Sequence, residues 1–185
     1  MYSARDIPNI ISLGRIVLVF PIVWLLLDEQ FITAIILFFV AGVSDGVDGY
    51  LAKHYHWESR FGGIIDPLAD KFLLVSTYVC LAVLQALPWW FVGMILLRDV
   101  VIIGAVTFYN FRIARLEAAP TLISKLNTLL QILLALMVVF DLAFDNVNAT
   151  LILVMLWAVV VSTVGSFVGY AVEWNRRTGE NNHSG

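Results

Sequence analysis

The stretch Ser44–Lys71, SDGVDGYLAKHYHWESRFGGIIDPLADK, places four carboxylates inside a very apolar chain. They form two pairs, Asp45 with Asp48 and Asp66 with Asp70. Spacings of three and four residues put each pair on one face of a helix. Two interpretations are open: a polar loop between membrane segments, or a site that binds metal ions.

The composition indicates the setting of these acids. The chain has 185 residues, of which 61% are hydrophobic and only 14% are charged. A soluble domain is nearer half apolar and a quarter charged, so an integral membrane protein is predicted. The single cysteine, Cys80, excludes an intramolecular disulfide and a cysteine metal cluster, and its apolar surroundings favour a packing role.

A helix needs about 20 apolar residues to cross a bilayer. Six stretches satisfy this requirement, so we expect an all-α integral membrane protein with six transmembrane helices. A single transmembrane domain over residues 1–172 is expected, and the polar tail 173–185 is expected to fray. The expected spans are roughly 7–27, 31–52, 64–86, 89–110, 122–140 and 149–172.

The positions of the charges predict the orientation. The turns near residues 28–30, 85–88 and 141–148 contain no Lys or Arg, whereas the opposite side is basic. Cytoplasmic loops carry the excess of Lys and Arg, so both termini are expected in the cytoplasm. The residues expected on the cytoplasmic side are Arg5, Lys53, Arg60, Arg112, Arg115, Arg176 and Arg177.

This topology brings the four aspartates to the cytoplasmic membrane edge, at the end of the second span and the start of the third. Clustered carboxylates repel one another, so they must take up protons or bind cations. Oxygen-only ligands favour Mg²⁺, Mn²⁺ or Ca²⁺. Gly46 and Gly49 leave room beside the acids for a ligand or another helix.

Each piece also has a simpler interpretation. A single aspartate is tolerated at a helix end in the headgroup region, and glycines often serve helix packing in membranes. The loop residues His54 and His56 are expected to be solvated. The four acids together, at one membrane depth, favour the metal site.

The stretch resembles the signature of the CDP-alcohol phosphatidyltransferase family, Asp-x2-Asp-Gly-x2-Ala-Arg-x8-Gly-x3-Asp-x3-Asp. Every position agrees except Lys53, where the family has arginine; lysine keeps the charge but loses the two-pronged geometry toward phosphate. The matching positions are Asp45, Asp48, Gly49, Ala52, Gly62, Asp66 and Asp70.

The resemblance implies a role for each residue. Asp45, Asp48 and Asp66 would bind two Mg²⁺ or Mn²⁺ ions, and Asp70 would combine metal binding with the role of general base. The donor would be CDP-diacylglycerol and the released product CMP. The nucleotide and substrate contacts would come from Gly49, Ala52, Lys53, Gly62, Asn9 and Arg15. A homodimer in the membrane is also implied.

The acceptor alcohol is less well defined. The segments 61–71, 98–99 and 123–131 resemble the cardiolipin synthase and phosphatidylglycerophosphate synthase branch. Asp99 after the helical arginine favours phosphatidylglycerol as acceptor, and glycerol 3-phosphate is the alternative. Both carry a phosphate, for which the expected ligands are Arg98, Arg112, Arg115 and Lys125. Arg98 could instead pair with an acid and hold helices together, and the other three could reflect only the positive-inside tendency.

Three competing functions are weaker. A membrane prenyl-diphosphate transferase needs more helices, and a cation transporter would spread its acids along a path. A catalytically inactive relative that acts as a membrane partner would be marked by Lys53. No nucleic acid is expected as a partner. The lack of an Arg-rich transit peptide favours a bacterial cytoplasmic membrane with the active site facing the cytoplasm.

Overall fold

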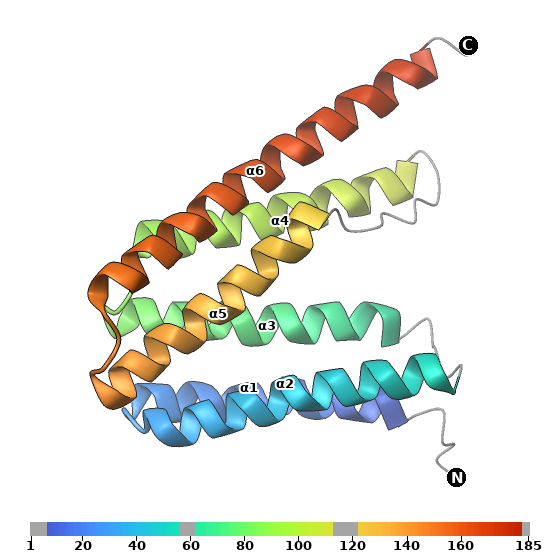
Figure 1. Cartoon of the computed structure of the whole chain (residues 1–185). Helices are drawn as coiled ribbons and strands as arrows, with labels where there is room; N and C mark the ends of the chain where they lie inside the picture. Colours follow the sequence, from blue (N-terminus) through green and yellow to red (C-terminus); the bar gives the residue numbers. More distant parts are fainter. Residues whose placement is uncertain (1–6, 56–61, 113–121, 183–185) are drawn as a thin grey trace. The chain divides into compact units, whose positions relative to one another are not determined.

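The computed structural model describes residues 7–55, 62–112 and 122–182, which form six α-helices and no strand (Figure 1). The all-helical prediction is thus confirmed for the described chain. The helices are α1 (Ile7–Leu27), α2 (Phe31–His54), α3 (Gly62–Val83), α4 (Trp89–Arg112), α5 (Leu122–Phe144) and α6 (Ala149–Asn182).

Helices α5 and α6 extend furthest beyond their predicted ends. Helix α5 continues to Phe144, so Asp141 lies in the helix and not in the following turn. Helix α6 continues to Asn182, whereas the sixth span was predicted to end near residue 172. The polar segment has no proline and extends an existing helix, which adds hydrogen bonds without a new nucleation step.

Helices α1, α3 and α5 are each followed by a residue whose backbone has the left-handed conformation, in the three turns that contain no Lys or Arg. Glu29 and Gln85 each have a φ of 59°, and Asp145 has a φ of 47°. After α1, the amide of Gln30 donates to the carbonyl of Leu25 at 2.8 Å. This bond closes a Schellman motif, which satisfies carbonyls that the helix end leaves free.

Two helices of the described chain are long and apolar enough to cross a membrane, over Ile123–Phe144 and Ala149–Phe167. Shorter apolar helical stretches cover Ile11–Leu27 and Phe31–Ser44. These stretches account for four of the six helices of the described chain, and each covers only part of its helix or most of it. Six complete spans therefore remain a prediction.

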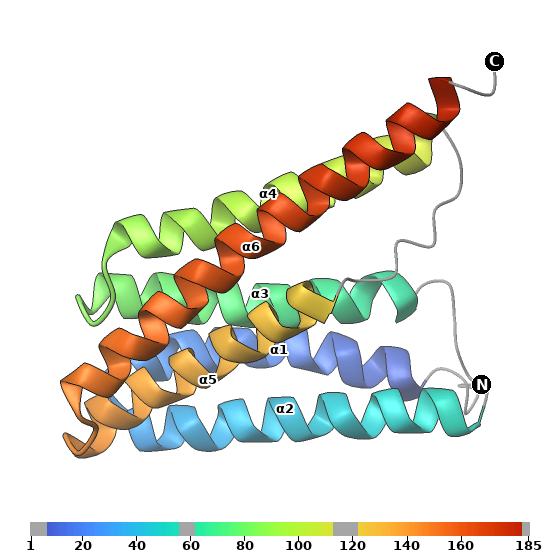
Figure 2. The ribbon, with the colours of Figure 1, turned by 45° about the horizontal axis from the view of Figure 1, so that its top comes forward.

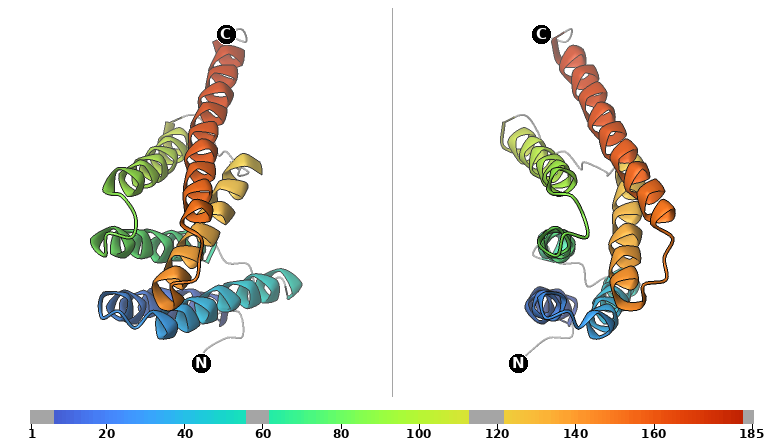
Figure 3. Two further views of the ribbon diagram at one scale, coloured as in Figure 1. Left: turned by 60° about the vertical axis from the view of Figure 1, so that its left-hand side comes forward. Right: turned by 90° about the vertical axis from the view of Figure 1, so that its left-hand side faces the viewer.

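The chain divides into two compact units, 1–87 with 135–147, and 88–134 with 148–185. In the first unit α1 packs against both α2 and α3 and lies between them (Figures 2 and 3). Its core includes Ile22 and Leu26 of α1, with Tyr78 and Leu81 of α3. The start of α1, the end of α2 and the start of α3 lie at the same end of this unit (Figures 1 and 2).

The second unit consists of α4, the first half of α5 and α6. Helices α4 and α6 pack against each other around the buried side chains of Phe91, Ile95 and Val159. The rings of Trp90 and Trp157 lie 6.4 Å apart, and both side chains are about half exposed.

Candidate active site

The four aspartates lie on two helices of the first unit. Asp45 and Asp48 are in the second half of α2, and Asp66 and Asp70 are in the first half of α3. Because these two helix ends lie at the same end of the unit (Figure 1), both pairs belong to one region of the structure. The convergence of the four carboxylates stays a prediction.

The side chains of several predicted site residues lie outside the described part of the structure, although their backbone belongs to α1, α2, α3 or α4. These residues are Asn9, Asp45, Asp48, Gly49, Ala52, Lys53, Gly62, Asp66 and Arg112. Arg115 lies wholly outside the described residues. Their predicted contacts stay predictions.

Asp70 has a partner that the sequence did not reveal. Arg15 of α1, which is 1% exposed, donates from Nη1 to Asp70 Oδ1 on α3. Asp70 itself is 47% exposed, so its carboxylate contacts both the buried guanidinium group of Arg15 and the surroundings of the protein. Arg15 was predicted to contact the nucleotide or substrate, and in the structure it holds the predicted general base.

The surroundings of Gly46 are open. A methyl group built on Gly46 meets no atom within 4 Å among the described residues. The use of this glycine, as space for a ligand or for another helix, stays a prediction.

The donor chemistry of this region fits a hard divalent cation, because carboxylate oxygens are its preferred ligands. Among the described side chains no group of three or more His, Cys, Asp or Glu residues could hold a metal, and the side chains of Asp45, Asp48 and Asp66 are not among those described. The half-exposed carboxylate of Asp70 is the one predicted ligand whose side chain is described.

The first unit also contains a small cavity that is separate from this region. It measures about 10 Å³ and is lined by Leu26, Ala34, Phe38, Thr77 and Leu136, among others. The Thr77 hydroxyl donates to the carbonyl of Leu73 at 2.9 Å within its own helix. An apolar cavity of this size holds no substrate and stays dry.

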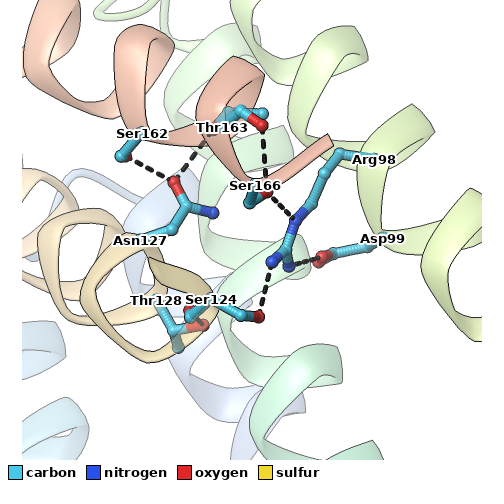
Figure 4. Close-up of polar contacts among 8 residues, drawn as sticks. All are labelled: Arg98, Asp99, Ser124, Asn127, Thr128, Ser162, Thr163 and Ser166. Carbon is cyan, nitrogen blue, oxygen red and sulfur yellow. Dashed lines mark hydrogen bonds and ion pairs between the residues drawn. The ribbon is translucent and has the colours of Figure 1, made fainter. Parts of the chain in front are cut away.

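A polar network occupies the interior of the second unit (Figure 4). Arg98, which is 2% exposed, donates from Nη1 to Asp99 Oδ1 at 2.7 Å and from Nη2 to Ser124 Oγ at 2.7 Å. Its Nε donates to Ser166 Oγ at 3.1 Å. Arg98 was predicted as an acceptor ligand, and all three of its nitrogens bind protein groups.

The same network contains residues that sequence reasoning did not single out. Asn127 is fully buried, and its Oδ1 accepts from Ser162 Oγ at 2.7 Å and from Thr163 Oγ1 at 2.9 Å. The available signal was the spacing of Ser124, Asn127, Thr128 and Gln131, which forms a polar stripe along an otherwise apolar helix.

Lys125 differs from its neighbours in the network because its side chain is exposed. It follows Ser124 directly and therefore lies about 100° around α5 from it. Of the four predicted acceptor ligands, Lys125 is the one whose described side chain is accessible to a ligand.

The sequence of the chain matches that of a known protein family over most of its length. The pattern of the CDP-alcohol phosphatidyltransferase family matches residues 5–165. The chain therefore belongs to the CDP-alcohol phosphatidyltransferase family, which is membrane-embedded.

Individual relatives divide between two named activities. The chain is 31% identical to the human cardiolipin synthase (CMP-forming) over 93% of the chain, and 29% identical over 92% of it to a rice chloroplastic CDP-diacylglycerol–glycerol-3-phosphate 3-phosphatidyltransferase. A Bacillus subtilis protein of the latter name is 30% identical over 87% of the chain. The chain spans 62% of the human protein and 57% of the rice protein, but 91% of the Bacillus protein.

Proposed function

We propose that this protein transfers the phosphatidyl group from CDP-diacylglycerol to a glycerol-type alcohol and releases CMP. The observation that supports the proposal is the complete set of four aspartates in the sequences of α2 and α3. Family membership supports the reaction class, and both activities named for the relatives belong to it.

Asp45, Asp48, Asp66 and Asp70 would hold two Mg²⁺ or Mn²⁺ ions. Bound there, the ions supply neutralisation of the donor's diphosphate, which is the main requirement of phosphoryl transfer. Gly46 leaves room for the donor beside the acids, and Gly49, Ala52, Gly62 and Lys53 would contact the nucleotide. Asn9 at the start of α1 would contribute a further polar contact.

Asp70 would accept the proton from the acceptor hydroxyl. The acceptor oxygen then forms a bond to the phosphorus nearer the lipid, the bond from that phosphorus to CMP breaks, and CMP leaves. Arg15 fixes the orientation of the Asp70 carboxylate through its hydrogen bond from α1. The orientation of this carboxylate matters because a general base must lie within hydrogen-bond distance of the group whose proton it accepts.

Phosphatidylglycerol is the acceptor that we favour, with cardiolipin as product. Glycerol 3-phosphate is the second candidate, because relatives with that activity match as well as the cardiolipin synthases do. In either case Lys125, with Arg112 and Arg115, would bind the acceptor's phosphate.

The same proposal includes the setting of the reaction. It comprises six transmembrane helices with both termini in the cytoplasm, which the charge distribution supports, and a homodimer in a bacterial cytoplasmic membrane. A nucleotide from water and a diacyl chain from lipid meet at the membrane edge, where the aspartates are expected.

The deciding experiment incubates purified protein with CDP-diacylglycerol and Mg²⁺, with phosphatidylglycerol in one arm and glycerol 3-phosphate in the other. CMP and cardiolipin are expected in the first arm. Product from glycerol 3-phosphate alone would replace the favoured acceptor with the second candidate. No CMP in either arm would refute the reaction class and favour an inactive membrane partner protein.

A further inference from the structure

Arg98 is fully engaged by the protein. Its three nitrogens donate to Asp99 of α4, Ser124 of α5 and Ser166 of α6, at distances between 2.7 and 3.1 Å (Figure 4). The guanidinium group is a rigid fork, so these bonds fix the relative positions of three helices. A side chain with 2% exposure and these partners is not presented to a ligand.

A second set of bonds lies one turn further along α5. Asn127 Oδ1 accepts from Ser162 Oγ and Thr163 Oγ1 of α6, at 2.7 and 2.9 Å. The beginning of α5 is therefore attached to its neighbours at two successive turns. In a membrane the lipid is as apolar as the side chains, so the association of helices is stabilised by hydrogen bonds between them and by close packing.

The attachment lies beside Lys125, which follows Ser124 and is exposed. A lysine reaches phosphate with a flexible stem, so the position of its backbone decides where its ammonium group can bind. Displacement of a binding group by about 1 Å lowers a rate by roughly 100-fold when the group positions a substrate. Because the two residues are consecutive, a shift of the Ser124 backbone also shifts the backbone of Lys125.

We propose that Arg98 is a positioning residue for acceptor binding: through Ser124 it fixes the first turn of α5 and so the place of Lys125. This inference rests on the proposed function and changes the expected role of Arg98, which acts through protein groups and not by contact with the acceptor.

The test is a double-mutant cycle with Arg98→Lys and Ser124→Ala. Arg98→Lys keeps the charge but cannot serve three partners in a fork. With CDP-diacylglycerol, Mg²⁺ and each acceptor in turn, both single variants are expected to raise the acceptor KM about tenfold, as for loss of a charged hydrogen bond. The KM for CDP-diacylglycerol is expected to stay unchanged, and the double variant to resemble either single variant.

Thr128→Val is the matched control. Its hydroxyl donates within α5, to the carbonyl of Ser124 at 3.1 Å, so its loss breaks a bond inside one helix and leaves the bonds of Arg98 and Asn127 to other helices in place. Its acceptor KM should stay within about twofold of the wild type.

Several results would overturn the inference. Additive effects of the two substitutions, or a normal acceptor KM in Ser124→Ala, would mean that Arg98 contacts the acceptor directly. An equal rise in both KM values would mean a general structural role. Absence of transfer by the wild type would refute the proposed function itself, and the role toward the acceptor with it, whereas the other outcomes leave the proposed function intact.

Discussion

Replacement of Asp70 by asparagine should destabilise the protein in the presence of a chelator, because Arg15 then loses its charged partner. Removal of one partner of a fully buried ion pair costs about 3–5 kcal/mol. Arg15 is 1% exposed but Asp70 is 47% exposed, so solvent offsets part of this loss. We expect a decrease of about 1–3 kcal/mol in the free energy of unfolding.

The sign of this effect is informative, because repulsion among the four aspartates acts in the opposite direction. If repulsion dominated, the loss of one carboxylate would stabilise the chelated protein. Asp66→Asn, one turn earlier on α3, is the matched comparison and is expected to leave stability equal or increased. The pair of variants separates the ion pair from the general effect of charge.

The assay is thermal unfolding of the purified protein in detergent with chelator, followed by intrinsic fluorescence. The expected loss corresponds to a fall of roughly 2–12 °C in Tm for Asp70→Asn. In an Arg15→Met background the same substitution should cause no further fall, since the partner is already absent. An unchanged or higher Tm for Asp70→Asn in the wild-type background would refute the stabilising role of the pair.

Three further substitutions test other parts of the structure. Glu29→Gly should raise Tm by a few degrees, because glycine adopts the left-handed conformation at the end of α1 without strain; a fall would contradict the Schellman motif. Gly46→Ala should stabilise α2 by about 1 kcal/mol yet raise the KM for CDP-diacylglycerol, and an unchanged KM would remove Gly46 from the donor site. Lys125→Gln should raise the KM for the phosphate-bearing acceptor about tenfold with the donor KM unaffected, and equal KM values in wild type and variant would exclude its role.

The helices were largely predictable because apolar runs and short turns limit where they can begin and end. The first span was predicted at 7–27, and α1 covers the same residues. The end of α6 was missed because polar residues after a span were taken as frayed, whereas an existing helix extends without a nucleation step.

The site was predictable only where its residues are close in sequence. The aspartates of α2 and α3 follow from helix spacing and the family signature, but the partner of Asp70 is 55 residues away on α1. The polar stripe of α5 is visible in the sequence, but its pairing with Ser162 and Ser166 depends on how α4, α5 and α6 pack. The spacing of residues along one helix shows which of them share a face, but it does not show which residues of another helix pack against that face.

The most direct test of the four-aspartate site is the number of Mn²⁺ ions that the purified protein binds in the presence of CDP-diacylglycerol. Electron paramagnetic resonance of free Mn²⁺ measures this number without any reaction. We predict about two ions for the wild type, as in two-metal sites for phosphoryl transfer, and weaker binding for Asp48→Asn and Asp66→Asn. Equal Mn²⁺ binding by the wild type and both variants would contradict the account.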